Sequence, residues 1–270
     1  MSNQEMLLGG GFSLIPPFSA TGGTITTVGA DTVHRFTGSG SFVVANAPIG
    51  FTVQYLVVAG GGGSDGYSSN EGGGGGGAGG LIYVTNAATA SGSYTVTVGG
   101  GGVASSNGAT SGQNSVISGL SSTAVGGGFS AQNAPSGNGG SGGGGNGFNS
   151  GRSGGTGIAG QGNNGGFGPE LGGSGGGGGS SSAGGDGSNP TGGSAGAGTL
   201  YSITGSSVRY ACGGPGQGRF YANSGAPTSG GSSVGQDGAA NTGNGAGGPI
   251  GFVGQQGGSG IVIIRYTTPT

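Results

Sequence analysis

The chain has 270 residues, of which 83 are glycine and only 4% are charged, with a formal net charge of -2. With so few charges, the sequence has neither the basic surface that binds nucleic acid nor the polybasic segment that binds anionic lipid. Collagen is excluded because the glycines come in blocks and there are only 10 prolines. One cysteine, Cys212, excludes an internal disulfide framework.

The longest glycine blocks are residues 72–77, 142–145 and 175–179. Glycine has no Cβ, so a block is useful where backbone must pack against backbone. An extended helix with three residues per turn leaves its N–H and C=O groups free for neighbouring segments. We therefore expect polyglycine II helices that lie side by side and bond to one another through the main chain.

Residues 1–20 combine short apolar runs with a Pro-Pro pair, which is unfavourable in a helix or in the interior of a sheet. We expect an extended arm that either covers its own domain or docks the protein onto a partner. The candidate attachment side chains are Leu7, Leu8, Phe12, Leu14, Ile15 and Phe18.

Strand patterns follow, rich in β-branched and aromatic residues. They cover residues 24–28, 32–36, 41–44 and 51–59, then 81–84, 94–98, 114–117, 208–212 and 261–266. The second half of 51–59 is a solid apolar run, which predicts burial on both faces. The final strand is equally apolar.

Pairing of the final strand with residues 55–58 would join the beginning of the domain to its end. We therefore expect one domain over residues 21–268. The fold class is all-β or irregular, with a small β-sheet layer, a sandwich of polyglycine II helices and essentially no α-helix. Strands pass directly into glycine segments at residues 59, 125 and 212, so Cys212 is expected to be a small buried hydrophobe.

Sequence motifs that would indicate catalysis, nucleotide binding or metal binding are weak. The pattern GxGxxG recurs without a following helix, a phosphate-binding loop needs a lysine that the chain lacks, and His34 is the only histidine. Residues 60–67 fit a calcium-binding nonapeptide, but such repeats bind metal only when stacked in tandem, and Asp186 and Asp237 lack the same flank. We expect no catalytic residues, no cofactor and no metal, and no enzyme.

Aromatic and arginine side chains lie in the polar loops between glycine blocks. Either they plug the open ends of the bundle or they form a recognition surface, since these types are enriched in binding hot spots. The candidates for receptor contact are Tyr67, Phe129, Phe148, Arg152, Phe167, Arg219, Phe220, Tyr221 and Phe252.

Five segments occur in order along the chain: VHRFTGSGSFVV (33–44), YLVVAGG (55–61), GAGGL (77–81), GQNS (112–115) and GGSGIVIIRY (257–266). Together they resemble the glycine-rich domain of bacteriophage tail-fibre and receptor-binding proteins. The resemblance implies a β-layer with a polyglycine II sandwich whose loops at one end choose the host receptor. Here only about twenty residues precede the strands, where those adhesins carry a substantial attachment domain.

These observations predict a bacteriophage virion protein, either a tail-fibre tip or a receptor-binding adhesin. The alternatives are a purely structural decoration or fibre protein of capsid or tail, and an ice-binding protein. The expected partners are other virion proteins through the arm, and a host polysaccharide or outer-membrane protein through the loops, without nucleic acid or membrane insertion. The start shows no secretory signal, so we expect synthesis in the host cytoplasm and exposure on the particle exterior.

Overall fold

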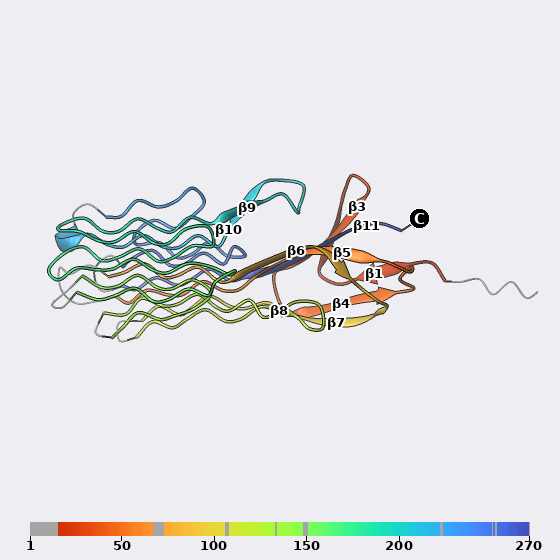
Figure 1. Ribbon diagram of the computed structural model, residues 1–270, viewed down its shortest axis with the longest axis horizontal. Coiled ribbons are helices and arrows are strands. Elements are labelled where there is room, and N and C mark those ends of the chain that lie inside the picture. Colours follow the sequence, from red (N-terminus) through yellow and green to blue (C-terminus); the bar gives the residue numbers. More distant parts are fainter. Residues whose placement is uncertain are drawn as a thin grey trace, which may run out of the picture.

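The computed structural model describes residues 16–66, 73–105, 108–132, 134–147, 151–221, 224–249, 251 and 253–269. The molecule is elongated, with β-sheets at one end and long glycine-rich segments running away from them (Figure 1). Within the described ranges, no helix has the length and apolar character needed to cross a bilayer.

The strands form three antiparallel sheets, which confirms the all-β expectation. A five-stranded sheet has the order β2-β3-β11-β5-β6, a four-stranded sheet the order β1-β4-β7-β8, and β9 pairs with β10. The bounds are β1 Ser19–Thr21, β2 Thr24–Val28, β3 Asp31–Phe36, β4 Gly40–Ala45, β5 Thr52–Val58, β6 Leu81–Ala88, β7 Gly92–Thr97, β8 Val116–Ile117, β9 Thr199–Tyr201, β10 Val208–Tyr210 and β11 Ile261–Thr267. In the described part of the chain, one 3₁₀ turn, η1, covers Arg219–Tyr221.

The predicted pairing of the beginning and the end of the domain is confirmed. Strand β11 lies antiparallel to β5, with Ile261 opposite Val58 and Ile264 opposite Tyr55. Both strands are central in the five-stranded sheet, and their apolar runs are buried on both faces, as the sequence predicted.

Two short strands were not predicted. β1 and β9 are three residues long each and carry no apolar alternation that would mark them. β1 pairs with β4, so the expected boundary between arm and domain after residue 20 falls inside a strand. Pairing with a partner strand, and not local propensity, makes these segments extended.

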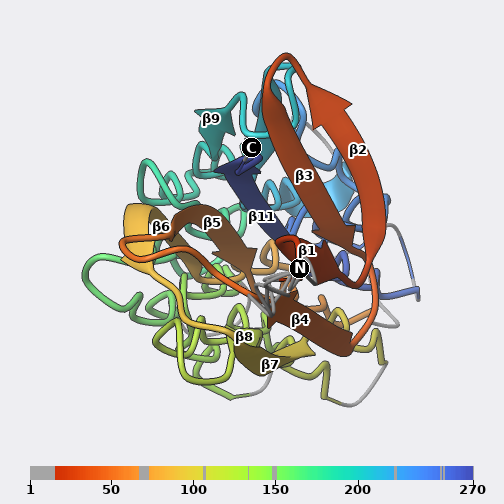
Figure 2. The same ribbon diagram turned by 90° about the vertical axis from the view of Figure 1, so that its right-hand side faces the viewer.

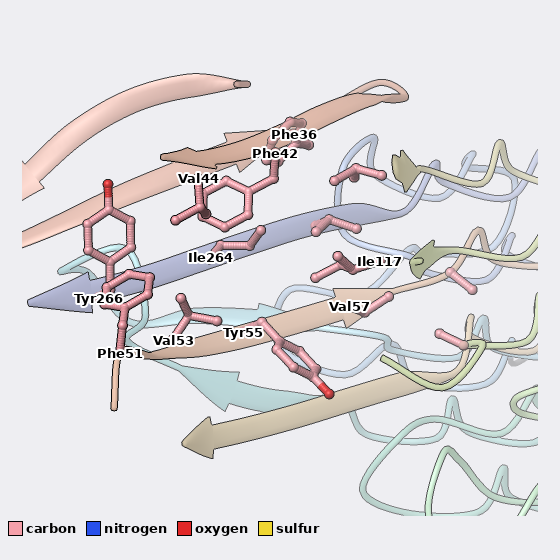
Figure 3. Packing of buried hydrophobic residues seen from close by; sticks show 14 residues of the cluster. Phe36, Phe42, Val44, Phe51, Val53, Tyr55, Val57, Ile117, Ile264 and Tyr266 are labelled. Carbon is pink, nitrogen blue, oxygen red and sulfur yellow. The ribbon is translucent and has the colours of Figure 1, made fainter. Parts of the chain in front are cut away.

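The main apolar core lies between the five-stranded and four-stranded sheets (Figure 3). Phe42 from β4, Ile117 from β8 and Ile264 from β11 are fully buried there. The other face of the five-stranded sheet packs a second cluster against β9 and β10, including Ile203 and Tyr210. Burial on both faces explains why β5 and β11 lack polar residues along most of their length.

His34 is completely buried in the sheet end and packs edge-on against Phe42. Its Nδ1 lies 2.7 Å from the carbonyl oxygen of Gly22, which can only accept, so Nδ1 carries the proton. Its Nε2 then accepts a hydrogen bond from the hydroxyl of Tyr266 at 3.0 Å. Burial lowers the pKa of His34, so the folded protein favours the neutral ring.

The glycine-rich end is a lattice of main chain with a threefold repeat. In residues 75–80, N–H groups three positions apart donate to the same neighbouring segment, as three residues per turn requires. The pairs are Gly75 to Gly175 and Ala78 to Gly178, Gly76 to Ala246 and Gly79 to Gly243, and Gly77 to Gly128 and Gly80 to Val125.

Carbonyl groups of the same stretch face three other segments. Residues 59–62, 141–144 and 214–217 each donate two N–H groups to carbonyls of residues 73–80, again at intervals of three. The segment 73–80 is therefore surrounded by six neighbours, three that accept from it and three that donate to it. This arrangement satisfies buried backbone without a conventional sheet.

The close packing explains the glycine blocks. A Cβ added at Gly75 would lie 2.0 Å from the carbonyl oxygen of Gly214, and one at Gly74 would lie 2.1 Å from that of Gly144. The obstacle is backbone held by its own hydrogen bonds, which cannot rotate away as a side chain could. Cys212 is fully buried where a strand passes into this lattice, in the position expected for a small hydrophobe.

Candidate functional site

Loops that join the glycine segments gather at the end of the molecule farthest from the sheets (Figure 1). We call this surface the distal tip. It comprises the described residues that join the outgoing and returning glycine segments there, namely 64–66, 103–105, 129–132, 145–147, 151–152, 167–172, 188–191, 217–221 and 253–255. The described chain begins beside β1 and ends after β11, both at the sheet end (Figure 2). The tip is thus the part of the described molecule most remote from both of these ends.

Asp65 fastens several loops of the distal tip together. Its carboxylate accepts hydrogen bonds from the backbone N–H groups of Ala109 and Gln132, and its backbone forms a parallel bridge with Ser105. Burial raises the pKa of the Asp65 carboxyl, and the donated N–H bonds oppose that rise. Across the ranges that the structure describes, no three histidine, cysteine or acidic side chains gather as a metal site.

The other two aspartates of the glycine bundle have the same kind of partner. Asp186 accepts the N–H of Phe167 at 2.7 Å, and Asp237 accepts the N–H of Gln256 at 2.7 Å. In each case a side-chain carboxylate supplies the acceptor that a neighbouring main-chain carbonyl would otherwise provide. These carboxylates therefore complete the lattice at its edges.

A cluster of Leu171, Arg219 and Phe220, which we call the Phe220 patch, projects from the distal tip. The Arg219 guanidinium lies 4.6 Å from the centroid of the Phe220 ring and donates a hydrogen bond of 3.0 Å to the carbonyl of Leu171. The N–H of Arg219 is bonded to the carbonyl of Pro190 at 2.9 Å. The arginine therefore ties two loops together and supports the aromatic ring.

The backbone of this patch is strained at its two apolar residues. Leu171 has a φ of 53° and Phe220 a φ of 54°, a left-handed conformation that costs about 1–2 kcal/mol for a residue with a Cβ. The side chains of Leu171 and Phe220 are nevertheless 44% and 60% exposed. Burial of these side chains therefore does not offset the backbone strain, and outliers of this kind cluster at active sites, ligand clamps and switch regions.

The other candidate aromatics and arginines differ in exposure. Phe129 is half-buried against Gly137, where an added Cβ would lie 2.5 Å from the phenylalanine ring. Arg152 is half-buried in an antiparallel bridge with Gly168, and Phe167 is 41% exposed. Phe129 thus plugs the bundle, while Phe167 is open to a partner. Tyr67, Phe148, Phe252 and the side chain of Tyr221 lie outside the described residues.

The candidate attachment residues Leu7, Leu8, Phe12, Leu14 and Ile15 also lie outside the described residues. Phe18 is described and packs on the domain's own core. Its ring centroid lies 5.0 Å from that of Phe51 and 5.6 Å from that of Tyr266. Phe18 therefore covers its own domain, which was one of the two expected roles of the arm.

Three exposed apolar residues of the distal tip were missed from the sequence. Val103 is 57% exposed and Val253 is 64% exposed, besides Leu171. A single valine or leucine among glycines has no periodicity to mark it. These residues are exposed because the packed glycine segments end at their positions, so no neighbouring segment covers their side chains.

The family model for a glycine-rich domain matches residues 35–267, from β3 to the end of β11. Comparison with curated proteins gives no match. The resemblance is therefore confirmed at the level of the glycine-rich domain.

Proposed function

The chain belongs to the glycine-rich domain family, and we propose that it is a non-enzymatic bacteriophage virion protein that recognises the host cell surface through its distal tip. In this proposal it is a tail-fibre tip or receptor-binding adhesin, exposed on the outside of the particle. The part of the N-terminal arm that precedes Phe18 attaches it to other virion proteins of fibre, tail or capsid, since Phe18 and β1 pack on the domain itself. The host partner is a surface polysaccharide or an outer-membrane protein.

The observation that carries the proposal is the Phe220 patch at the end of a rigid main-chain bundle. Arginine and aromatic side chains are enriched in binding hot spots, and this arginine holds the aromatic ring in place before any partner arrives. A side chain that is ordered in advance loses less entropy on binding. The six-neighbour packing of residues 73–80 supplies the rigid support.

The arrangement of the two ends also supports it. The first described residues lie at the sheet end (Figure 1). The exposed apolar residues Leu171, Phe220 and Val253 belong to loops of the distal tip. A protein attached by its N-terminal segment would hold its distal tip away from the particle. Loop surfaces on a rigid scaffold are a common location for recognition.

Binding of the purified, fluorescently labelled protein to a panel of bacterial strains tests the proposal. For a strain that binds, Phe220→Ala should weaken binding by about tenfold or more, since a hot-spot truncation costs ~2 kcal/mol. The matched control is Ile49→Ala, which removes a fully exposed apolar side chain at the sheet end and should leave binding unchanged.

Two results would contradict receptor binding through the tip. One is equal binding by the Phe220→Ala and parent proteins. The other is no binding to the host, together with virions that stay infectious after the gene is deleted. That second result would instead favour a structural decoration protein of capsid or tail.

A further inference from the structure

A cavity of about 360 Å³ lies at the sheet end, away from the distal tip. Its walls come from β2 and β3, from β10 and the turn that precedes it, and from the loop at residues 240–242. Figure 2 shows β2, β3 and β9 along the same side of the molecule. The volume falls in the lower range of cavities that hold small molecules.

Strand register brings three polar residues, Thr24, Thr26 and Arg35, to one wall of this cavity. Thr24 of β2 lies opposite Arg35 of β3, and Thr26 lies opposite Val33. Residues directly opposite each other in an antiparallel pair project from the same face of the sheet. Val33 belongs to the cluster on the β9–β10 side of the sheet, so Arg35 is directed to that side too.

Three polar groups in the lining lack a hydrogen-bond partner among the described residues. In the part of the chain that the structure describes, no hydrogen bond or ion pair occupies the Arg35 guanidinium, the Tyr210 hydroxyl or the Asn241 amide. The ring of Tyr210 is buried in the second cluster, and its hydroxyl is not a fully buried unpaired atom, so it remains accessible from the cavity that the residue lines. Arg35 and Tyr210 both line this cavity, so the two groups face a common space.

Asn241 is held in place by its backbone. It has a φ of 61°, and its N–H donates to the Ser259 hydroxyl at 2.9 Å. Next to it, the Thr242 hydroxyl donates to the carbonyl of Ala239 at 2.6 Å. These bonds fix the loop and leave the Asn241 amide free as a donor and an acceptor toward the cavity.

We propose that this cavity binds an acidic monosaccharide, such as the uronic acid unit of a polysaccharide. The guanidinium of Arg35 pairs with the sugar carboxylate, since its planar fork matches carboxylate geometry. The Tyr210 hydroxyl, the Asn241 amide and the threonine hydroxyls bond to the sugar hydroxyls. Val33 and Val208 contact the apolar face of the ring.

The mixed lining favours a sugar acid over a bare anion or a neutral sugar. A small anion would use Arg35 but would leave Tyr210 and Asn241 without partners. A neutral sugar would form no ion pair with the Arg35 guanidinium. The site lies apart from the Phe220 patch, so it is independent of the proposed receptor-binding tip.

Isothermal titration of the full-length protein with sodium glucuronate tests the site, with glucose and sodium acetate as comparison ligands. Arg35→Gln should weaken glucuronate binding about tenfold or more, and Tyr210→Phe about two- to tenfold. Arg152→Gln is the matched control, because it removes an arginine at the distal tip and should leave the affinity unchanged. Thermal unfolding of each variant checks that it is folded. We expect both variants to fold, because the Arg35 side chain is exposed and phenylalanine keeps the aromatic ring of Tyr210.

Selective, saturable glucuronate binding that depends on Arg35 and Tyr210 supports the proposal. Absence of saturable binding by the folded parent protein overturns it. So does glucuronate affinity that is equal in the parent and the folded Arg35→Gln variant. Acetate or glucose bound as tightly as glucuronate would overturn the assignment to a sugar acid.

Discussion

The two ends of this molecule bury their chains by different means. At the sheet end, large side chains such as Phe42 and Ile264 fill the space between two sheets, as in ordinary proteins. In the glycine bundle, the main chain itself fills the space, and residues 73–80 exchange hydrogen bonds with six neighbours. A side-chain core can relax around a lost group. A lattice of packed main chain has no space for an added side-chain group.

The largest effect is expected for Gly75→Val in the centre of the bundle. A Cβ there lies 2.0 Å from the Gly214 carbonyl, so we expect a loss of ~5 kcal/mol or more and little recoverable folded protein. Gly92→Val is the matched control, since Gly92 is exposed in β7 with nothing within 4 Å of a Cβ. Soluble yield and thermal unfolding measure both. Near-parental stability of Gly75→Val would mean that the lattice is not tightly packed.

Phe42→Ala should cost ~3–5 kcal/mol, because it removes a fully buried ring from between the sheets. Val43→Ala on the same strand, where the side chain is 39% exposed, should cost less than ~1 kcal/mol. Urea unfolding of the two variants gives the comparison. If they are equally destabilised, the side-chain core contributes less than its burial implies.

Acidification should weaken the sheet end through His34. The pKa of the buried ring is lowered from 6.5, so the unfolded chain binds a proton that the folded chain rejects. The stabilisation that neutral His34 gives the folded state is complete above about pH 6.5. It is lost as the pH falls toward the lowered pKa of the folded protein. Urea unfolding at about pH 8 and about pH 5 should show this loss.

His34→Gln isolates that effect, because His34 is the only histidine of the chain. Its unfolding midpoint should change less between the two pH values than that of the parent protein. Equal pH dependence in the two proteins would assign the loss to other groups.

The smallest effect is expected at Leu171 on the distal tip. Leu171→Gly should leave stability unchanged or raise it by up to about 1 kcal/mol, because glycine adopts a φ of 53° without a Cβ penalty. Val103→Gly, also exposed on the tip but without a positive φ, should instead cost ~0.5–1 kcal/mol. Thermal unfolding shows whether each substitution raises or lowers the stability. A clear loss for Leu171→Gly would mean that its side chain stabilises the monomer.

Most strands could be predicted because their signal is local. The apolar runs at residues 55–58 and 261–264 indicated both their extended form and their pairing. β1 and β9 could not be predicted, since their short sequences become strands only through their partners β4 and β10. The free Tyr210 hydroxyl in the cavity was equally hidden, because β10 alone does not show that Arg35 lies nearby.

The sequence by itself determined that main chain packs against main chain, since only glycine permits neighbouring carbonyls about 2 Å from where a Cβ would lie. Only the tertiary structure decided which segments are neighbours and which loops meet at the distal tip. The physical reason is that glycine blocks present the same N–H and C=O groups to one another. Partner choice therefore depends on where the chain reverses and on how the sheets orient each segment, and it leaves little trace in the local sequence.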